Sequence, residues 1–115
     1  MQDCKELNIL SITTTVSSLE TAKALAREIL AQKLAACVQL DQSVISLYRW
    51  KGEPCEEPEV RLVIKSLPGC EAALQELFAR HHPYELAQFL AQPMSASQAY
   101  AQWVRAEVAV PPVRS

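Results

Sequence analysis

Residues 35–65 predict a β-hairpin that is very long for a chain of 115 residues. The first arm spans 35–50 and has a polar interruption at 41–43, which is typical of a bent or bulged strand. Residues 51–54 carry the glycine and proline of a turn, and 59–65 alternates apolar and polar residues as the return arm. Such a ribbon leaves strand edges open, and self-association into a closed ring is one way to protect them.

The segments on either side of the hairpin predict two further strands and three helices. The predicted elements are a strand at 6–15, a helix opened by a capping box of Ser17 and Glu20 and running to about Lys33, a second helix after Leu67-Pro68-Gly69 that stops near His82, a strand at 85–94 and a helix at 95–107. The order βαββαβ plus a C-terminal helix predicts an α+β, ferredoxin-like domain with an antiparallel sheet and both main helices on one face. We expect a single domain over 1–115 with an ordered core at about 6–107.

Composition excludes several classes of function. The formal net charge of -2 gives no basic surface for nucleic acid, and no apolar run approaches the ~20 residues of a membrane helix. The first residues lack the pattern of a secretory signal, so the expected location is the cytoplasm, where the four cysteines stay as thiols. With only two glycines, the chain has neither a phosphate-binding loop nor a dinucleotide-binding fingerprint.

Five motifs in order along the chain resemble those of the CutA family. They are Leu34-Ala35-Ala36-Cys37, the hairpin segment Ser46-Leu47-Tyr48-Arg49-Trp50-Lys51-Gly52, Glu59-Val60 with Lys65, His82-Pro83-Tyr84-Glu85, and Ala99-Tyr100 with Trp103. The resemblance runs from about residue 8 to residue 106. It implies a ferredoxin-like homotrimer with β-pairing between subunits, similar in architecture to PII signalling proteins, and a role in tolerance of divalent cations, copper in particular.

Two departures from the family's pattern concern metal binding. Thr14 stands where some members of the family carry a cysteine, and Gln88 replaces a glutamate that usually follows the His-Pro-Tyr-Glu motif. Each change removes a potential ligand and leaves the fold unaffected. Both weaken any metal site that the resemblance implies.

The candidate metal ligands are His81, His82, Glu85 and Cys37. Imidazole suits Cu(II) and Zn(II), but adjacent residues on a helix diverge by about 100°, so one histidine would act with Glu85 or with a neighbouring subunit. The alternative is that both histidines only stabilise the helix C-terminus. Cys37 is either a soft ligand or a buried structural thiol.

Aromatic residues of the hairpin and of the His-Pro-Tyr-Glu motif predict a cleft between subunits. Tyr48, Trp50 and Tyr84 would line it, with Lys65 and Glu85 as its polar groups. The alternative is that these rings fill a trimer interface. The acidic residues Glu56, Glu57 and Glu59 lie near prolines, which predicts a solvated turn with a charged rim.

Two functional hypotheses follow. The first is a cytoplasmic homotrimer that binds a divalent transition metal such as Cu(II) weakly, contributes to metal tolerance and requires no cofactor. The second is a PII-like signalling or scaffold trimer that binds a small anion or a partner protein in its clefts, with Lys65 as the anchor. We expect no enzyme, because no nucleophile and base occur in a supporting context.

Overall fold

The computed structural model describes residues 8–111, which form a four-stranded antiparallel sheet and three α-helices. The elements are β1 (Asn8–Val16), α1 (Leu19–Ala31), β2 (Cys37–Trp50), β3 (Glu53–Ser66), α2 (Glu71–His81), β4 (Leu90–Ser95) and α3 (Gln98–Glu107), with a 3-10 turn at Pro68–Cys70 before α2. The spatial order of the strands is β2-β3-β1-β4. This order and connectivity confirm the predicted ferredoxin-like α+β fold.

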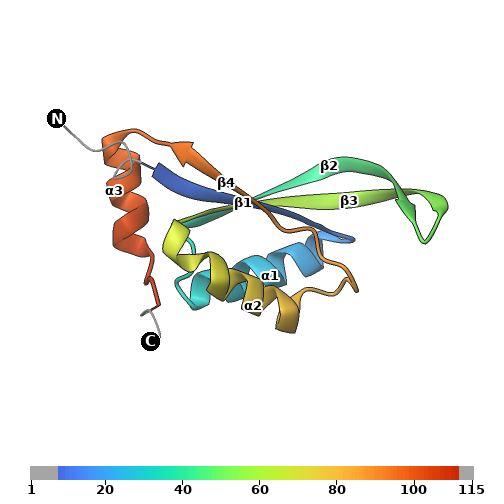
Figure 1. The fold of residues 1–115 in the computed structure, drawn as a ribbon, viewed down its shortest axis with the longest axis horizontal. Coiled ribbons are helices and arrows are strands. Elements are labelled where there is room, and N and C mark those ends of the chain that lie inside the picture. The colour runs from blue at the N-terminus through green and yellow to red at the C-terminus, as the bar shows by residue number, and fades with distance from the viewer. Residues whose placement is uncertain (1–7, 112–115) are drawn as a thin grey trace.

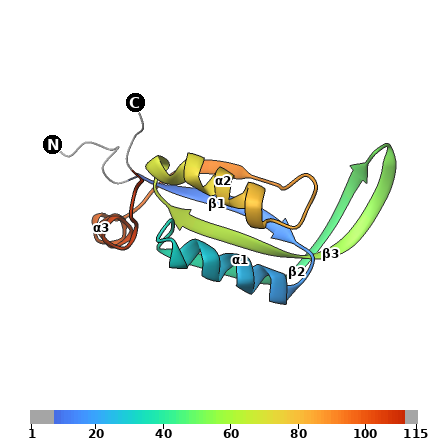
Figure 2. The ribbon, with the colours of Figure 1, turned by 90° about the horizontal axis from the view of Figure 1, so that it is seen from below.

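The helices α1 and α2 cover one face of the sheet, while α3 lies at one end of the molecule (Figures 1 and 2). Alternate residues of the central strands point toward the helices, as the pleat of a strand requires. Ile12 of β1 and Leu62 and Ile64 of β3 have no exposed surface, and they belong to one continuous apolar cluster with α1 and α2. The core therefore holds the base of the hairpin against the helices.

The distal half of the β2–β3 hairpin projects beyond the rest of the sheet and curls (Figure 2). The pairing of β1 with β3 ends at Val16 and Val60, whereas β2 and β3 continue to the turn. A register shift between Asp41 and Val44 confirms the predicted interruption. It is stabilised locally by the N–H of Ser43, which donates to Asp41 Oδ1 over 2.9 Å.

The return arm of the hairpin starts earlier than predicted. Lys51 and Gly52, with φ angles of 51° and 84°, make the turn, and β3 begins directly at Glu53. Pro54 and Pro58 therefore lie inside a strand and not in a turn, although both prolines, with Glu56 and Glu57, are exposed as expected. Proline is tolerated because this part of β3 has a neighbour on one side only, so that a missing N–H can face the open edge.

The first helix differs from the prediction at both ends. Its N-cap is Ser18, whose Oγ accepts the N–H of Thr21 over 3.1 Å, and not Ser17. The helix ends at Ala31 because Lys33 adopts a left-handed conformation with φ 57°. The cap is thus shifted by one residue relative to the capping-box pattern.

The segment before the last strand is irregular, contrary to the prediction of a strand over 85–94. Pairing with β1 starts only at Leu90, opposite Thr13, so residues 83–89 form a loop that we call the 83–89 loop. Similarly, α3 begins at Gln98 and not at residue 95, because Ser95 still pairs with Asn8. Residues 6 and 7 of the predicted first strand lie outside the described residues.

Candidate functional site

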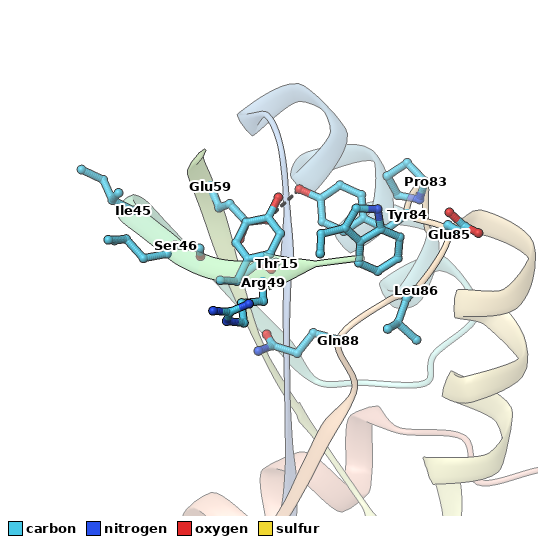
Figure 3. Close-up of a pocket in the computed structure, with 13 residues that line it drawn as sticks. Thr15, Ile45, Ser46, Arg49, Glu59, Pro83, Tyr84, Glu85, Leu86 and Gln88 are labelled. Carbon is cyan, nitrogen blue, oxygen red and sulfur yellow. Dashed lines mark hydrogen bonds between the residues drawn. The ribbon is translucent and has the colours of Figure 1, made fainter. Parts of the chain in front are cut away.

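A cleft of about 850 Å³ lies between the curled hairpin and the 83–89 loop (Figure 3). Strand β2 lines one side, and the 83–89 loop lines the other. The lining residues are Thr15, Ile45, Ser46, Leu47, Tyr48, Arg49, Trp50, Glu59, Pro83, Tyr84, Glu85, Leu86 and Gln88. Three aromatic rings and two carboxylates therefore converge on one concave surface.

A hydrogen bond between Tyr84 and Glu59 connects the two sides of the cleft. The phenol O–H of Tyr84 donates to Glu59 Oε2 over 2.7 Å (Figure 3). Burial, together with this hydrogen bond, raises the pKa of Tyr84 well above its ordinary value, so the phenol stays protonated and donates. Glu59 is only 8% exposed, which contradicts the expectation that it belongs to a solvated rim.

The aromatic residues of β2 share one face of the hairpin with acidic residues of β3. Ser46 pairs with Glu57, and Tyr48, two residues further along β2, pairs with Cys55. Glu59 lies on the same face because side chains alternate along a strand. Desolvation first, and then the Cys55 thiol and the carboxylates of Glu57 and Glu59, raise the pKa of Tyr48. The cleft thus has a negative electrostatic character beside its rings.

The predicted cleft residues do not all meet. Tyr48, Trp50 and Tyr84 line the cleft together with Glu85, but Lys65 is not among its lining residues. Lys65 lies near the C-terminal end of the inner strand β3, opposite Cys37 on β2. The cation that was expected to anchor an anion is therefore located elsewhere on the sheet. Glu59, which sequence analysis assigned to a turn, lines the cleft instead and accepts the hydrogen bond of Tyr84.

His82 is buried and both of its ring nitrogens have partners. Its Nδ1 accepts the N–H of Tyr84 over 3.2 Å, so Nε2 carries the proton and donates to Thr14 Oγ1 over 2.9 Å. Desolvation lowers the pKa of His82, partly opposed by a hydrogen bond with the backbone of Thr15 and by the charge of Glu59. This neutral imidazole joins the end of α2 to β1, and binding a metal through either ring nitrogen would displace a hydrogen-bond partner.

The other predicted metal ligands are dispersed. His81 Nε2 lies 3.6 Å from Glu28 Oε1 on α1, and both side chains are exposed. Glu85 and His82 line a smaller hollow of about 410 Å³ beside α2, while Cys37 is a half-buried thiol on β2. Within residues 8–111, no group of three or more His, Cys, Asp or Glu side chains could hold a metal ion. The contact between His81 and Glu28 joins two helices and had no signal in the sequence.

The two departures from the family pattern occupy different places. Thr14, where some members of the family carry a cysteine, is in direct contact with His82. Gln88 lines the cleft on the side of the 83–89 loop. A thiol at the first position would lie beside an imidazole, whereas the hydroxyl present here serves as a hydrogen-bond partner for it. The replacement removes a soft donor from the immediate surroundings of His82.

Comparisons with known proteins agree on one family. The family model described as "CutA1 divalent ion tolerance protein" matches residues 10–107. The "Divalent-cation tolerance protein CutA" of Escherichia coli O139:H28 is 35% identical over 111 residues, which cover 94% of this chain and 99% of that protein. "Protein CutA" of Homo sapiens is 38% identical over 92 residues, covering 79% of this chain, and the match spans about half (51%) of the human protein.

Solved structures with these family names have the same fold. The crystal structure of CutA1 from Oryza sativa superposes with a TM-score of 0.86 at 28% identity and covers 91% of this chain and 97% of its own. CutA1 from the psychrotrophic bacterium Shewanella sp. SIB1 gives a TM-score of 0.82 at 35% identity, with 87% and 94% of the two chains covered. Among residues 8–111, none of the helices has the length and apolar character needed to cross a membrane. From the family match and these relatives, we conclude that the chain belongs to the CutA1 divalent ion tolerance family.

Proposed function

We propose that the protein acts in the cytoplasm as a homotrimer that contributes to tolerance of divalent metal ions and binds a transition metal such as Cu(II) weakly. The names of its relatives support the role in divalent-cation tolerance. Free thiols at Cys37, Cys55 and Cys70 are in keeping with a reducing compartment. The protein is proposed to need no cofactor and to catalyse no reaction.

Exposed apolar side chains on both margins of the sheet are the observation that carries the proposed self-association. The edge strands are β2 and β4. Ile45 and Leu47 on β2 are 66% and 72% exposed, and Leu90 and Met94 on β4 are also exposed. Open edges with apolar residues favour pairing with another chain. Because each subunit has one edge of each kind, head-to-tail pairing of β2 with β4 would generate a ring.

The mass of the protein in solution tests this assembly. Light scattering at micromolar concentration should give three times the chain mass of 12.8 kDa. Leu47→Lys should shift the population toward smaller species, because it places a charge on the proposed interface. Leu30→Lys, also at an exposed leucine but on helix α1 and not on an edge strand, should leave the mass unchanged. A monomer at this concentration would contradict the proposal.

His81 and Glu28 are the donors that we propose for weak metal binding. An imidazole and a carboxylate are suitable ligands for Cu(II) and Zn(II), and their donor atoms are already 3.6 Å apart at an exposed position. Two protein ligands leave the rest of the coordination sphere to water, which accounts for low affinity. Such a site does not require His82 to give up its hydrogen bonds to Thr14 and Tyr84.

Isothermal titration with Cu(II) and Zn(II) tests these ligands. His81→Gln and Glu28→Gln should each reduce the binding heat strongly, whereas Glu76→Gln, an exposed glutamate on α2, should behave as the unmodified protein. His82→Gln should retain binding. Equal heats for the unmodified protein and His81→Gln would reject the proposed pair. Loss of binding only in His82→Gln would instead indicate the buried histidine.

The alternative hypothesis, a PII-like trimer with an anion in its clefts, lacks support from its proposed anchor. Lys65 is absent from the cleft lining, and the buried charged group there is the carboxylate of Glu59. A thermal-shift screen of anionic metabolites separates the two hypotheses. Stabilisation by an anion in the absence of metal would favour the alternative.

A further inference from the structure

Glu59 is a buried carboxylate that lacks a cationic partner among the described residues. It is 8% exposed, and its side-chain hydrogen bond comes from the neutral phenol of Tyr84. The cation two positions along the same face of β3, Arg61, instead pairs with Asp41 at 3.3 Å. Burying an ionised carboxylate is costly unless a positive charge or several donors compensate for it. A positive charge brought by a ligand would relieve this cost.

The aromatic side chains around Glu59 are the kind that bind cations. Tyr48, Trp50 and Tyr84 all line the same cleft, and the faces of such rings attract ammonium and guanidinium groups. The indole of Trp50 already has a cation over it, because Lys51 Nζ lies 5.6 Å from the ring centroid. Rings that can surround a cation thus occur together with a buried counter-charge.

Charges elsewhere in the cleft do not offset Glu59. The other charged lining residues are Glu85 and Arg49. Arg49 alternates with Tyr48 and Trp50 along β2, and so it belongs to the opposite face of the hairpin. Its guanidinium donates to the carbonyl of Gly52 over 3.3 Å, and Figure 3 shows it on the other side of β2 from Tyr84. Lys51, which lies over Trp50, is not among the lining residues, so the charged groups that line the aromatic side of the cleft are carboxylates, which oppose an anion and favour a cation.

The donors in this part of the cleft select the type of cation. A metal ion held in this cleft would need several oxygen, nitrogen or sulfur ligands at short distance, and among residues 8–111 no group of three or more His, Cys, Asp or Glu side chains could supply them. An organic cation spreads its charge over a larger surface and needs one carboxylate together with apolar contacts. The cleft of about 850 Å³ also leaves room for the remainder of an organic molecule beyond the charged group.

We propose that this cleft binds a small organic cation, with an ammonium or guanidinium group held between Tyr48, Trp50 and Tyr84 and with Glu59 as its counter-ion. This site goes beyond the proposed role in metal tolerance. It uses different residues from the His81–Glu28 pair, so that either proposal can fail without the other.

Tryptophan fluorescence measures this binding directly. The chain has two tryptophans, and Trp103→Phe leaves Trp50, which lines the cleft, as the sole reporter. The probes are tetramethylammonium and methylguanidinium chlorides, at up to ~50 mM, enough to saturate a site with a Kd of about 1 mM. Sodium chloride at equal ionic strength controls for salt. Tert-butanol, which is similar in shape to tetramethylammonium but uncharged, controls for apolar binding.

We expect a saturable change with at least one of the two cations and none with sodium chloride or tert-butanol. The cation that binds more tightly identifies the preferred group, ammonium or guanidinium. Glu59→Gln, which keeps an acceptor for Tyr84, should weaken binding at least about tenfold. Glu56→Gln, on the same strand but outside the cleft lining, should leave the affinity unchanged.

Three results would overturn the proposal. They are no saturable response to either cation, an equal response to tert-butanol, or equal affinity in Glu59→Gln and in the parent protein. Should Glu59→Gln fail to fold, Tyr48→Leu replaces it, since Tyr48 is exposed and its removal should also weaken cation binding. Unchanged affinity in Tyr48→Leu would then count against the aromatic site.

Discussion

Removing the phenol oxygen of Tyr84 should destabilise the protein by about 2 kcal/mol. Tyr84→Phe keeps the ring in place but deletes the 2.7 Å hydrogen bond to Glu59 Oε2. Hydrogen bonds to charged groups contribute about 1.5–3 kcal/mol, and a buried acceptor left without its donor accounts for much of that loss. Because Glu59 is 8% exposed, water cannot fully replace the phenol, although the open side of the cleft keeps the expected value below the upper limit.

Urea unfolding at one fixed protein concentration measures the effect, since the stability of an oligomer depends on concentration. Tyr100→Phe on α3 is the matched control, because this tyrosine is exposed, and it should change the unfolding free energy by less than about 0.5 kcal/mol. In a Glu59→Gln background, Tyr84→Phe should cost only about 1 kcal/mol, the value for a neutral hydrogen bond. An equal cost in both backgrounds, or a cost no larger than that of Tyr100→Phe, would refute the assignment.

Three further predictions concern stability. Burial lowers the folded-state pKa of His82, so its contribution is fully present above the unfolded pKa of about 6.5 and is lost as pH falls through the lower folded value. His82→Gln should abolish this acid-side decrease in the unfolding free energy, whereas His81→Gln should retain it; a decrease that persists in His82→Gln would point to another group. Ser18→Ala should cost about 1 kcal/mol in a urea titration because it removes the cap of α1, and Ser17→Ala should change stability by less than about 0.5 kcal/mol; the reverse order would restore the capping box first predicted. Gly52→Ala should cost about 1 kcal/mol because φ is +84° there, and a thermal melt that shows no loss would mean that the turn adapts.

Much of the fold could be predicted from local pattern alone. The alternation along β3 and the polar interruption before Val44 reflect the pleat and the bulge directly, and both were found in the sequence. The errors occurred where tertiary contacts decide. Residues 85–89 are apolar enough for a strand, but β1 offers pairing only up to Thr13, opposite Leu90. Pro54 and Pro58 predict a turn from sequence alone. They fit a strand because this part of β3 pairs with β2 only, and that pairing cannot be read from the sequence.

The candidate site was predictable in part. The aromatic residues Tyr48, Trp50 and Tyr84 belong to recognisable sequence motifs, and all three line the cleft as predicted. The central role of Glu59 was missed because its burial depends on Tyr84, which lies far along the chain. The contact of His81 with Glu28 depends on how two helices pack side by side. Sequence spacing within either helix carries no information on such a contact.

Pro54 and Pro58 have a consequence for the newly made chain. All of β3 is synthesised well before β4, so the hairpin leaves the ribosome while the sheet is incomplete. Neighbouring nascent chains on one messenger RNA then present identical ribbons at high local concentration, a situation that promotes misassembly. Prolines at the outer margin of β3 offer no N–H to an incoming strand. This margin of the ribbon is therefore a poor template for pairing with the same ribbon of another chain.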